Sequence, residues 1–155
     1  GTDAARFFFV MRSIDSQLDF DLDLAKKKSN DNPVFYVQYA HARICSILRQ
    51  VAEAGIPVEG KGNYTLLTHP AEVDLIKKLG EYPELIATAA RERAVQMVAH
   101  YVYELAGLFH TAYNQCRILG VEPDLQQARL ALVLAVGHVV RHALGILGVS
   151  APEKM

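Results

Sequence analysis

The chain has 155 residues, of which 51% are hydrophobic and 21% charged, and its formal net charge is −1. These values indicate one soluble globular domain of ordinary size with a single core. No run of about eighteen uncharged apolar residues is present, which argues against a membrane-spanning segment. Phosphate contacts dominate affinity for nucleic acids, so the slightly acidic balance excludes a uniformly basic nucleic-acid binder. Any such function would need local clusters of Arg and Lys.

The first third of the chain is predicted to form three helices. Thr2 and Asp3 can cap a first helix from Ala4 to about Ser13. A short second helix is expected from Phe20 to Lys28, because acidic residues at its start and lysines at its end suit the helix dipole. A third helix is predicted from Pro33 to about Glu53, with one apolar stripe that faces the core.

The rest of the chain is also predicted to be helical, with no strand alternation and no internal repeat. A surface loop is expected from Gly55 to Asn63. The next predicted helix runs from His69 through Leu79, and after a break at Tyr82-Pro83 it resumes from Glu84 to Arg91. A long helix is expected from about Ala94 to Leu119. The last helix is expected to start after Pro123-Asp124 and to run to about Leu147, closing at Gly148. The fold class is therefore all-α, a bundle of five to seven helices joined by short connections.

Two cysteines, Cys45 and Cys116, both fall in apolar helical stretches. Packed thiols in a reduced, cytoplasmic setting are the favoured interpretation. His41 stands four residues before Cys45 and could act as a base. No third group orients such a pair, which argues against nucleophilic catalysis.

The sequence contains neither of the glycine-rich phosphate-loop motifs, GxGxxG and GxxxxGK[ST]. His138 and His142 stand four residues apart on one helical face, a spacing that could hold a metal ion. No third ligand can be named, and Arg141 lies beside the pair. A small metal-dependent hydrolase that uses these histidines is therefore a remote alternative, and we predict no catalytic residue and no metal site.

Four segments, in order along the chain, resemble the C-terminal DALR-type anticodon-binding domain of bacterial arginyl-tRNA synthetases. The first, Asp3-Ala4-Ala5-Arg6 followed by Phe7-Phe8, is similar to the DALR tetrad, with Ala5 where the name has Leu. The others are residues 18–25, residues 33–43 and residues 128–155, the last including the terminal Met.

The resemblance implies that residues 1–155 are one anticodon-binding domain, excised from a longer synthetase, that holds the anticodon loop of arginine tRNA and recognises chiefly its central cytosine. Complete enzymes of the family couple arginine to tRNA, using ATP and Mg, on a catalytic domain with HIGH-like and KMSKS-like motifs, and neither motif occurs here. We therefore expect no catalysis and no cofactor in this chain alone. The expected partners are the tRNA and the catalytic domain of the same polypeptide. The parent enzyme is expected to be a monomer in the cytoplasm, without membrane association.

The resemblance also implies an anticodon site. Tyr36 lies where the family presents an aromatic ring, Arg49 where an Arg helps to form the base pocket, and Tyr113 at a matching Tyr. Met155 is expected to close the pocket, and Arg117 falls where some members place an aromatic residue. Tyr39 and Arg43 are further candidates.

These residue types suit the task, because proteins read unpaired bases by stacking on aromatic rings or guanidinium planes and by hydrogen bonds to base edges. Phe109, Tyr113 and Arg117 recur every four residues and are predicted to form one row on one helix. Arg49 lies roughly 140° around the helical wheel from Tyr36. A common pocket therefore requires a neighbouring helix, expected to be the one that carries Tyr113.

Structural roles remain alternatives for each candidate. The tyrosines could be half-buried packing residues, and Arg43 could pair with an acid in the first two helices. Arg6 is expected to be structural, and Lys26-Lys27-Lys28 a solvated helix end. The alternative function is a helical protein–protein interaction module that docks a partner through its tyrosine-rich flank, which the nearly neutral charge favours.

Overall fold

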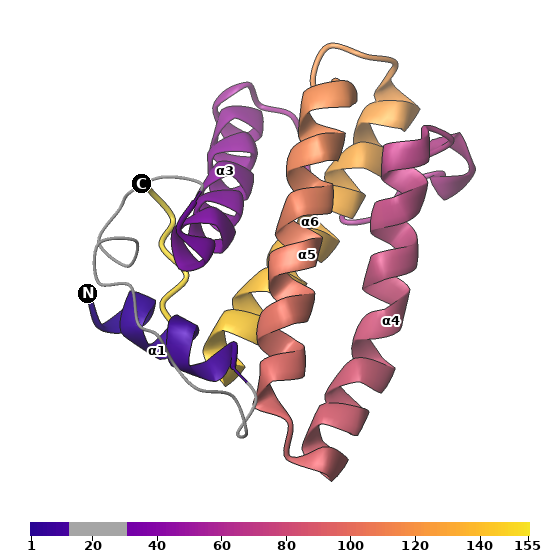
Figure 1. Ribbon diagram of the computed structural model, residues 1–155. Coiled ribbons are helices and arrows are strands. Elements are labelled where there is room, and N and C mark those ends of the chain that lie inside the picture. Colours follow the sequence, from indigo (N-terminus) through magenta and orange to yellow (C-terminus); the bar gives the residue numbers. More distant parts are fainter. Residues whose placement is uncertain (13–30) are drawn as a thin grey trace.

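A computed structural model of the protein describes residues 1–12 and 31–155. These residues form α1 (Thr2–Val10), α3 (Pro33–Glu53), the 3-10 helix η1 (Tyr64–Leu66), α4 (Pro70–Glu92), α5 (Val95–Gln115) and α6 (Pro123–Ile146) (Figure 1). Within these two ranges there are five α-helices and no strand, so the prediction of an all-α bundle is confirmed. The helix expected from Phe20 to Lys28 lies outside the described residues.

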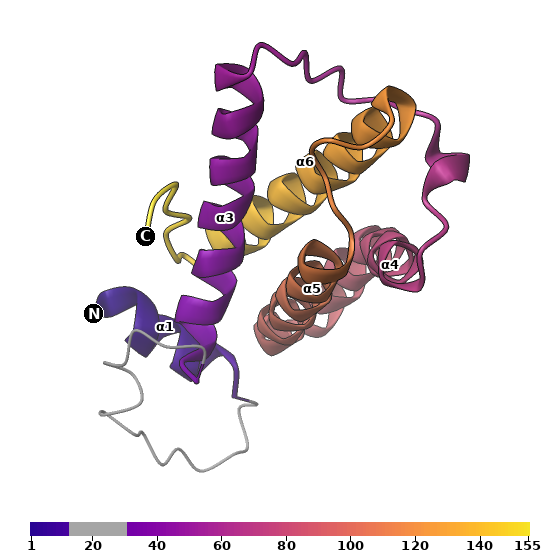
Figure 2. The same ribbon diagram turned by 90° about the horizontal axis from the view of Figure 1, so that it is seen from above.

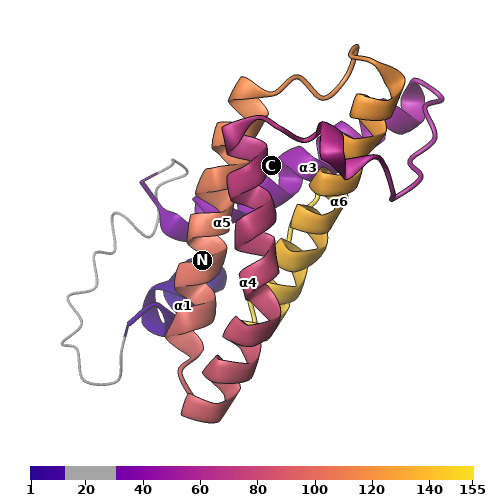
Figure 3. The same cartoon turned by 90° about the vertical axis from the view of Figure 1, so that its right-hand side faces the viewer.

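The helices pack in two groups around one core. Figure 3 shows α4, α5 and α6 side by side, and α3 crosses α5 and α6 on the opposite side from α4 (Figure 2). The short α1 packs against α3 and α5. The largest fully buried side chains come from α1, α3, α4, α5 and α6, and include Phe7, Ile44, Leu105, Phe109, Leu130 and Leu144. Burial of these apolar faces is the main force that holds the helices together.

The third helix follows its prediction, since α3 begins at Pro33 and ends at Glu53. Residues 55–63 form the expected loop. The sequence did not predict η1, which begins after Asn63 because that side chain accepts a hydrogen bond from the Thr65 backbone N–H.

The predicted break at Tyr82-Pro83 is wrong, because α4 is one continuous helix that contains Pro83. A proline inside a helix removes one backbone hydrogen bond and costs about 3 kcal/mol. The packing around Tyr82 offsets this cost. The Tyr82 ring is buried, its hydroxyl lies 2.8 Å from Nδ1 of His142, and its centroid lies 5.1 Å from that of Tyr101.

Two other helices end earlier than predicted. α5 ends at Gln115 rather than Leu119, because Cys116 adopts an extended backbone (φ −118°, ψ 111°) and its side chain is buried. α1 ends at Val10, before the expected end at Ser13. The closure of α6 agrees with its prediction, since Gly148 has a φ of +64°, a conformation that glycine adopts without strain.

Among the described residues, α6 is the one helix with the length and apolar character of a membrane-spanning segment, with a mean hydropathy of 1.4 over its most apolar window. It packs against α3, α4 and α5, and 44% of that window is buried inside the protein. Helix packing in the bundle therefore accounts for its apolar composition.

The two ends of the chain meet beside α3 (Figure 1). Oδ2 of Asp3 accepts hydrogen bonds from the backbone N–H of Ser150 at 3.3 Å and from Nε2 of Gln38 at 3.0 Å. A guanidinium nitrogen of Arg6 donates to the carbonyl of Gly148. The acid and the base of the DALR-like tetrad thus join α1 to the residues that follow α6, which supports the structural role expected for Arg6.

Candidate nucleic-acid interface

An open cleft of about 470 Å³ lies over the second half of α3. One face of α3 forms its floor, Tyr113 of α5 forms one wall, and the last two residues form the other. Tyr39, Arg43, Arg49, Tyr113 and Met155 all line this cleft, so the structure brings together five of the seven predicted site residues. The remaining lining residues are Ala42, Ser46, Ile47, Gln50 and Lys154.

A stacked arrangement of Arg43 and two tyrosines forms one side of the cleft. The guanidinium carbon of Arg43 lies 4.7 Å from the ring centroid of Tyr39 and 4.4 Å from that of Tyr113. A guanidinium nitrogen of Arg43 also donates to the Tyr39 hydroxyl at 2.8 Å. The two distances from the guanidinium carbon to the ring centroids are typical of cation–π contacts. Arg43 therefore contacts two aromatic rings. The alternative of an ion pair with an acid in the first two helices stays untested, because all of those acids except Asp3 lie outside the described residues.

Arg117 lies in a second, adjoining recess of about 320 Å³. This recess shares Ile47, Gln50 and Tyr113 with the cleft. The prediction that Arg117 continues the row of Phe109 and Tyr113 on one helix is wrong, because α5 ends at Gln115. Arg117 reaches the neighbourhood of Tyr113 from the connection between α5 and α6 instead.

The wall opposite Tyr113 is the C-terminal tail, which we define as residues 149–155. A guanidinium nitrogen of Arg49 donates to the carbonyl of Glu153 at 3.1 Å. Met155, at the end of the tail, is 53% exposed and faces the cleft. Arg49 lies roughly 140° from Tyr36 on the α3 wheel, on the flank of α3 that contacts the tail. The tail therefore accounts for the place of Arg49 in the cleft. The helix of Tyr113 contributes to the common pocket as expected, but the tail, which was not expected to hold Arg49, contributes as well.

Tyr36 does not line the cleft. It lies on α3 one turn before Tyr39, and its ring packs 5.4 Å from that of Tyr103 and 4.7 Å from that of His110. A Cβ on Gly107 would lie 3.6 Å from the Tyr36 hydroxyl, an ordinary van der Waals distance, so the ring packs directly over the α5 backbone at Gly107. Burial, with a smaller contribution from Tyr103, raises the pKa of Tyr36. The placement of Tyr36 is that of a packing residue between α3 and α5.

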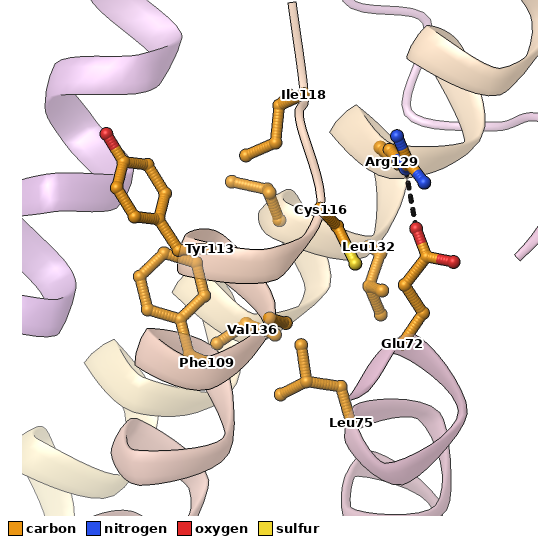
Figure 4. A pocket seen from close by; sticks show the side chains of 11 residues that line it. Glu72, Leu75, Phe109, Tyr113, Cys116, Ile118, Arg129, Leu132 and Val136 are labelled. Carbon is orange, nitrogen blue, oxygen red and sulfur yellow. Dashed lines mark hydrogen bonds and ion pairs between the residues drawn. The ribbon is translucent and has the colours of Figure 1, made fainter. Parts of the chain in front are cut away.

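Next to Tyr113, a small pocket lined by residues of α4, α5 and α6 adjoins the α5 end of the cleft (Figure 4). Glu72 of α4 is 2% exposed, and its Oε1 accepts a hydrogen bond from Nε of Arg129 on α6 at 2.6 Å. A second nitrogen of Arg129 donates to the carbonyl of Arg117 at 2.6 Å. This chain of contacts fixes the α5–α6 connection against two helices.

Among the described residues, the charged side chains that line the cleft and the recess are all positive. Arg43, Arg49, Arg117 and Lys154 contribute to the two linings, and no Asp or Glu side chain of the described part of the chain lines them. Nucleic-acid binding by a chain with a net charge of −1 would need a local basic cluster, and these side chains form one in the described part of the chain.

Three polar lining residues, Ser46, Gln50 and Lys154, were not among the predicted site residues. Tyr39, Arg43, Ser46 and Gln50 are spaced three or four residues apart, which places them on one ridge of α3. This spacing is the signal that could have identified Ser46. No periodic pattern could have identified Lys154, because the tail has no regular structure.

The alternative catalytic sites gain no support. Among residues 1–12 and 31–155, no group of three or more His, Cys, Asp or Glu side chains could hold a metal ion, and Nδ1 of His142 faces the Tyr82 hydroxyl. Burial raises the pKa of the Cys45 thiol, which keeps the sulfur protonated, and burial does the same for Cys116.

Comparisons with known proteins identify relatives of this chain. The chain is 55% identical, over its whole length, to the arginine–tRNA ligase of Desulforamulus reducens, and 56% identical, over 99% of its length, to that of Symbiobacterium thermophilum. It spans 28% of the length of each of these relatives. The structure superimposes on Thermus thermophilus arginyl-tRNA synthetase with a TM-score of 0.82 and 32% identity, over 99% of this chain and 26% of that one.

Residues 37–155 match the family described as the DALR anticodon binding domain. This match includes α3 from its second turn onward, the whole of α4, α5 and α6, and the tail. All the residues that line the cleft fall within it. The chain belongs to the DALR anticodon binding domain family, in the form found in arginine–tRNA ligases.

Proposed function

We propose that this domain binds the anticodon loop of arginine tRNA in the cleft between α3, Tyr113 and the C-terminal tail. The observation that carries the proposal is the Tyr39–Arg43–Tyr113 stack at the side of an open cleft. A splayed-out base can stack on such a surface, while the cleft offers hydrogen-bonding groups to its edge.

Each candidate residue has a separate proposed task. Tyr113, which is 39% exposed, supplies a ring face for stacking. Arg43 keeps that ring in place and adds positive charge. Arg49 and Gln50 present donors from the floor of the cleft, and Lys154 and Arg117 are placed to meet phosphates at its edges.

Met155 is proposed to cover the base from the tail side, since its flexible, polarizable side chain adapts to an irregular surface. Tyr36 is left out of this set, because its contacts are with other side chains of the bundle. The recognition surface thus draws on α3, the end of α5 and the tail.

The relatives of this chain are longer proteins, and the proposal extends to a complete enzyme of that kind. There the ATP- and Mg-dependent coupling of arginine to tRNA belongs to the catalytic domain outside residues 1–155. The present domain supplies tRNA selection without chemistry of its own. The complete enzyme is proposed to act as a monomer in the cytoplasm.

The test is binding of RNA stem-loops to this chain, followed by fluorescence anisotropy. One stem-loop carries the anticodon of an arginine tRNA, and its matched control differs only in the middle anticodon base. The proposal requires tighter binding of the first, and an affinity that falls steeply as salt rises, because phosphate contacts release counterions.

Equal affinity for both RNAs would overturn anticodon recognition and leave only general RNA binding. Absence of RNA binding, together with salt-insensitive binding of a protein, would favour the alternative of a protein-interaction module.

A further inference from the structure

The C-terminal tail has no regular secondary structure, yet three side chains of α3 bind its backbone. Nε2 of Gln38 donates to the carbonyl of Ser150 at 3.0 Å, and a ring nitrogen of His41, Nδ1, lies 2.9 Å from the carbonyl oxygen of Pro152. Arg49 donates to the carbonyl of Glu153 at 3.1 Å. Along the tail, Ser150, Pro152 and Glu153 are thus bound in turn by Gln38, His41 and Arg49, so the tail runs in the same direction as α3.

The spacing of these α3 residues shows that they form one ridge. Gln38, His41, Cys45 and Arg49 are three or four residues apart, so their side chains lie one above another on the helix. This ridge is distinct from the one that carries Tyr39, Arg43 and Gln50. Figure 2 shows the tail on the side of α3 away from α5.

His41 is the buried member of the ridge, with 1% of its surface exposed. Nε of Arg141 donates to its Nε2 at 3.4 Å. A guanidinium group can only donate, so Nε2 accepts, and the ring proton lies on Nδ1, which donates to Pro152. The imidazole thus links α6 to the tail through α3. Because it is buried, loss of this donor would leave the Pro152 carbonyl without its partner.

We propose that His41 is a positioning residue for RNA recognition, holding the tail so that Lys154 and Met155 form the second wall of the cleft. This inference rests on the proposed function, because it assigns to the tail a share in binding the anticodon loop. His41 itself does not line the cleft, so its effect on RNA passes through the tail.

The three methionines of the chain allow the tail to be observed directly. Met155 is in the tail, and Met97 lies at the other end of α5 from Tyr113, roughly 24 Å away along the helix axis. In the chain labelled with ¹³C at the Met methyl groups, the Met155 signal reports the tail and the Met97 signal reports the fold of the bundle.

The variants are His41→Leu, which removes both ring nitrogens, and His41→Asn, whose side-chain amide keeps a donor close to the position of Nδ1. His100→Leu makes the same chemical change at an exposed position on α5 and is the matched control.

For His41→Leu we expect the Met155 signal to move to the position of a free chain end while the Met97 signal stays. Affinity for the arginine-anticodon stem-loop should fall by about tenfold or more, the loss of one good contact. His41→Asn should restore most of that affinity, and His100→Leu should change neither the Met155 signal nor the affinity.

Three results would overturn the inference. The first is a Met155 signal that does not move in His41→Leu. The second is a released tail with unchanged RNA affinity, which leaves the proposed function intact. The third is a ¹⁵N spectrum of the wild-type chain that places the His41 proton on Nε2, a measurement that needs no variant and applies even if His41→Leu does not fold. If the wild-type chain binds no anticodon stem-loop, the proposed function fails and the recognition role of His41 fails with it. The Met155 signal then still reports whether His41 holds the tail.

Discussion

The guanidinium carbon of Arg43 lies 4.4 Å from the ring centroid of Tyr113 and so connects α3 to the last turn of α5 at the side of an open cleft. Tyr113 nevertheless stays 39% exposed, so part of the residue is accessible to solvent. An exposed aromatic ring that is fixed by a cation is a suitable platform for stacking a base.

Replacement of Tyr113 by Ala should weaken binding of the arginine-anticodon stem-loop by about 1–3 kcal/mol, the usual contribution of one stacked base. Tyr113→Phe keeps the ring and should lose much less. Tyr64→Ala, at a tyrosine that is 53% exposed on η1, is the remote control. Anisotropy titrations of the three variants check this, and equal losses for Tyr113→Ala and Tyr64→Ala would contradict it.

Tyr36→Ala should act on stability instead of recognition. The ring packs between Tyr103 and His110, so its removal leaves a cavity between α3 and α5 and should lower the free energy of unfolding by about 2–4 kcal/mol. Urea denaturation measures the loss, with Tyr36→Phe as the variant that keeps the packing. A large loss of RNA affinity with unchanged stability would instead return Tyr36 to the binding site.

The buried ion pair between Glu72 and Arg129 gives a prediction for the support of the cleft. Arg129→Met leaves the Glu72 carboxylate, which is 2% exposed, without its partner, and should cost about 3–5 kcal/mol. Replacing both residues, as Glu72→Gln with Arg129→Met, removes the uncompensated charge, so the double variant should be more stable than Arg129→Met alone. Additive losses in the denaturation series would show that the pair is not coupled.

His110 predicts how stability depends on pH. Burial lowers its pKa, and nearby Arg43 lowers it further, against the opposing effect of the Tyr36 carbonyl. The unfolded chain, with an ordinary histidine pKa of about 6.5, therefore binds more protons than the folded chain between that value and the lowered one. Stability should fall as pH drops below about 6.5. The difference in unfolding free energy between wild type and His110→Asn, measured from pH 7.5 down to pH 5, should shrink along that path, and a constant difference would refute the assignment.

The helices and much of the site could be predicted from local sequence signals. Proline at the first turn and glycine near the end fix the bounds of α3, and its apolar stripe identifies the buried face. Tyr113 was identified by resemblance, and Arg43 by its residue type and its place on the same face of the helix as Tyr39.

The errors in prediction arise where tertiary contacts outweigh local preferences. Pro83 indicated a break, but packing of the neighbouring Tyr82 on Tyr101 and His142 keeps α4 continuous. The end of α5 at Gln115 depends on Arg129, which binds the Arg117 carbonyl from a helix that comes later in the chain. The tail lies outside any periodic pattern, so its contact with Arg49 was visible only in three dimensions.

The most direct test of the account is the fluorescence of a cytosine analogue placed at the middle anticodon position of the arginine stem-loop. Stacking quenches such a base, so the account predicts saturable quenching on addition of the wild-type chain and little quenching by Tyr113→Ala. If anisotropy shows that the RNA binds while the fluorescence of the analogue stays unchanged, the base does not enter the cleft and the proposed recognition site is wrong.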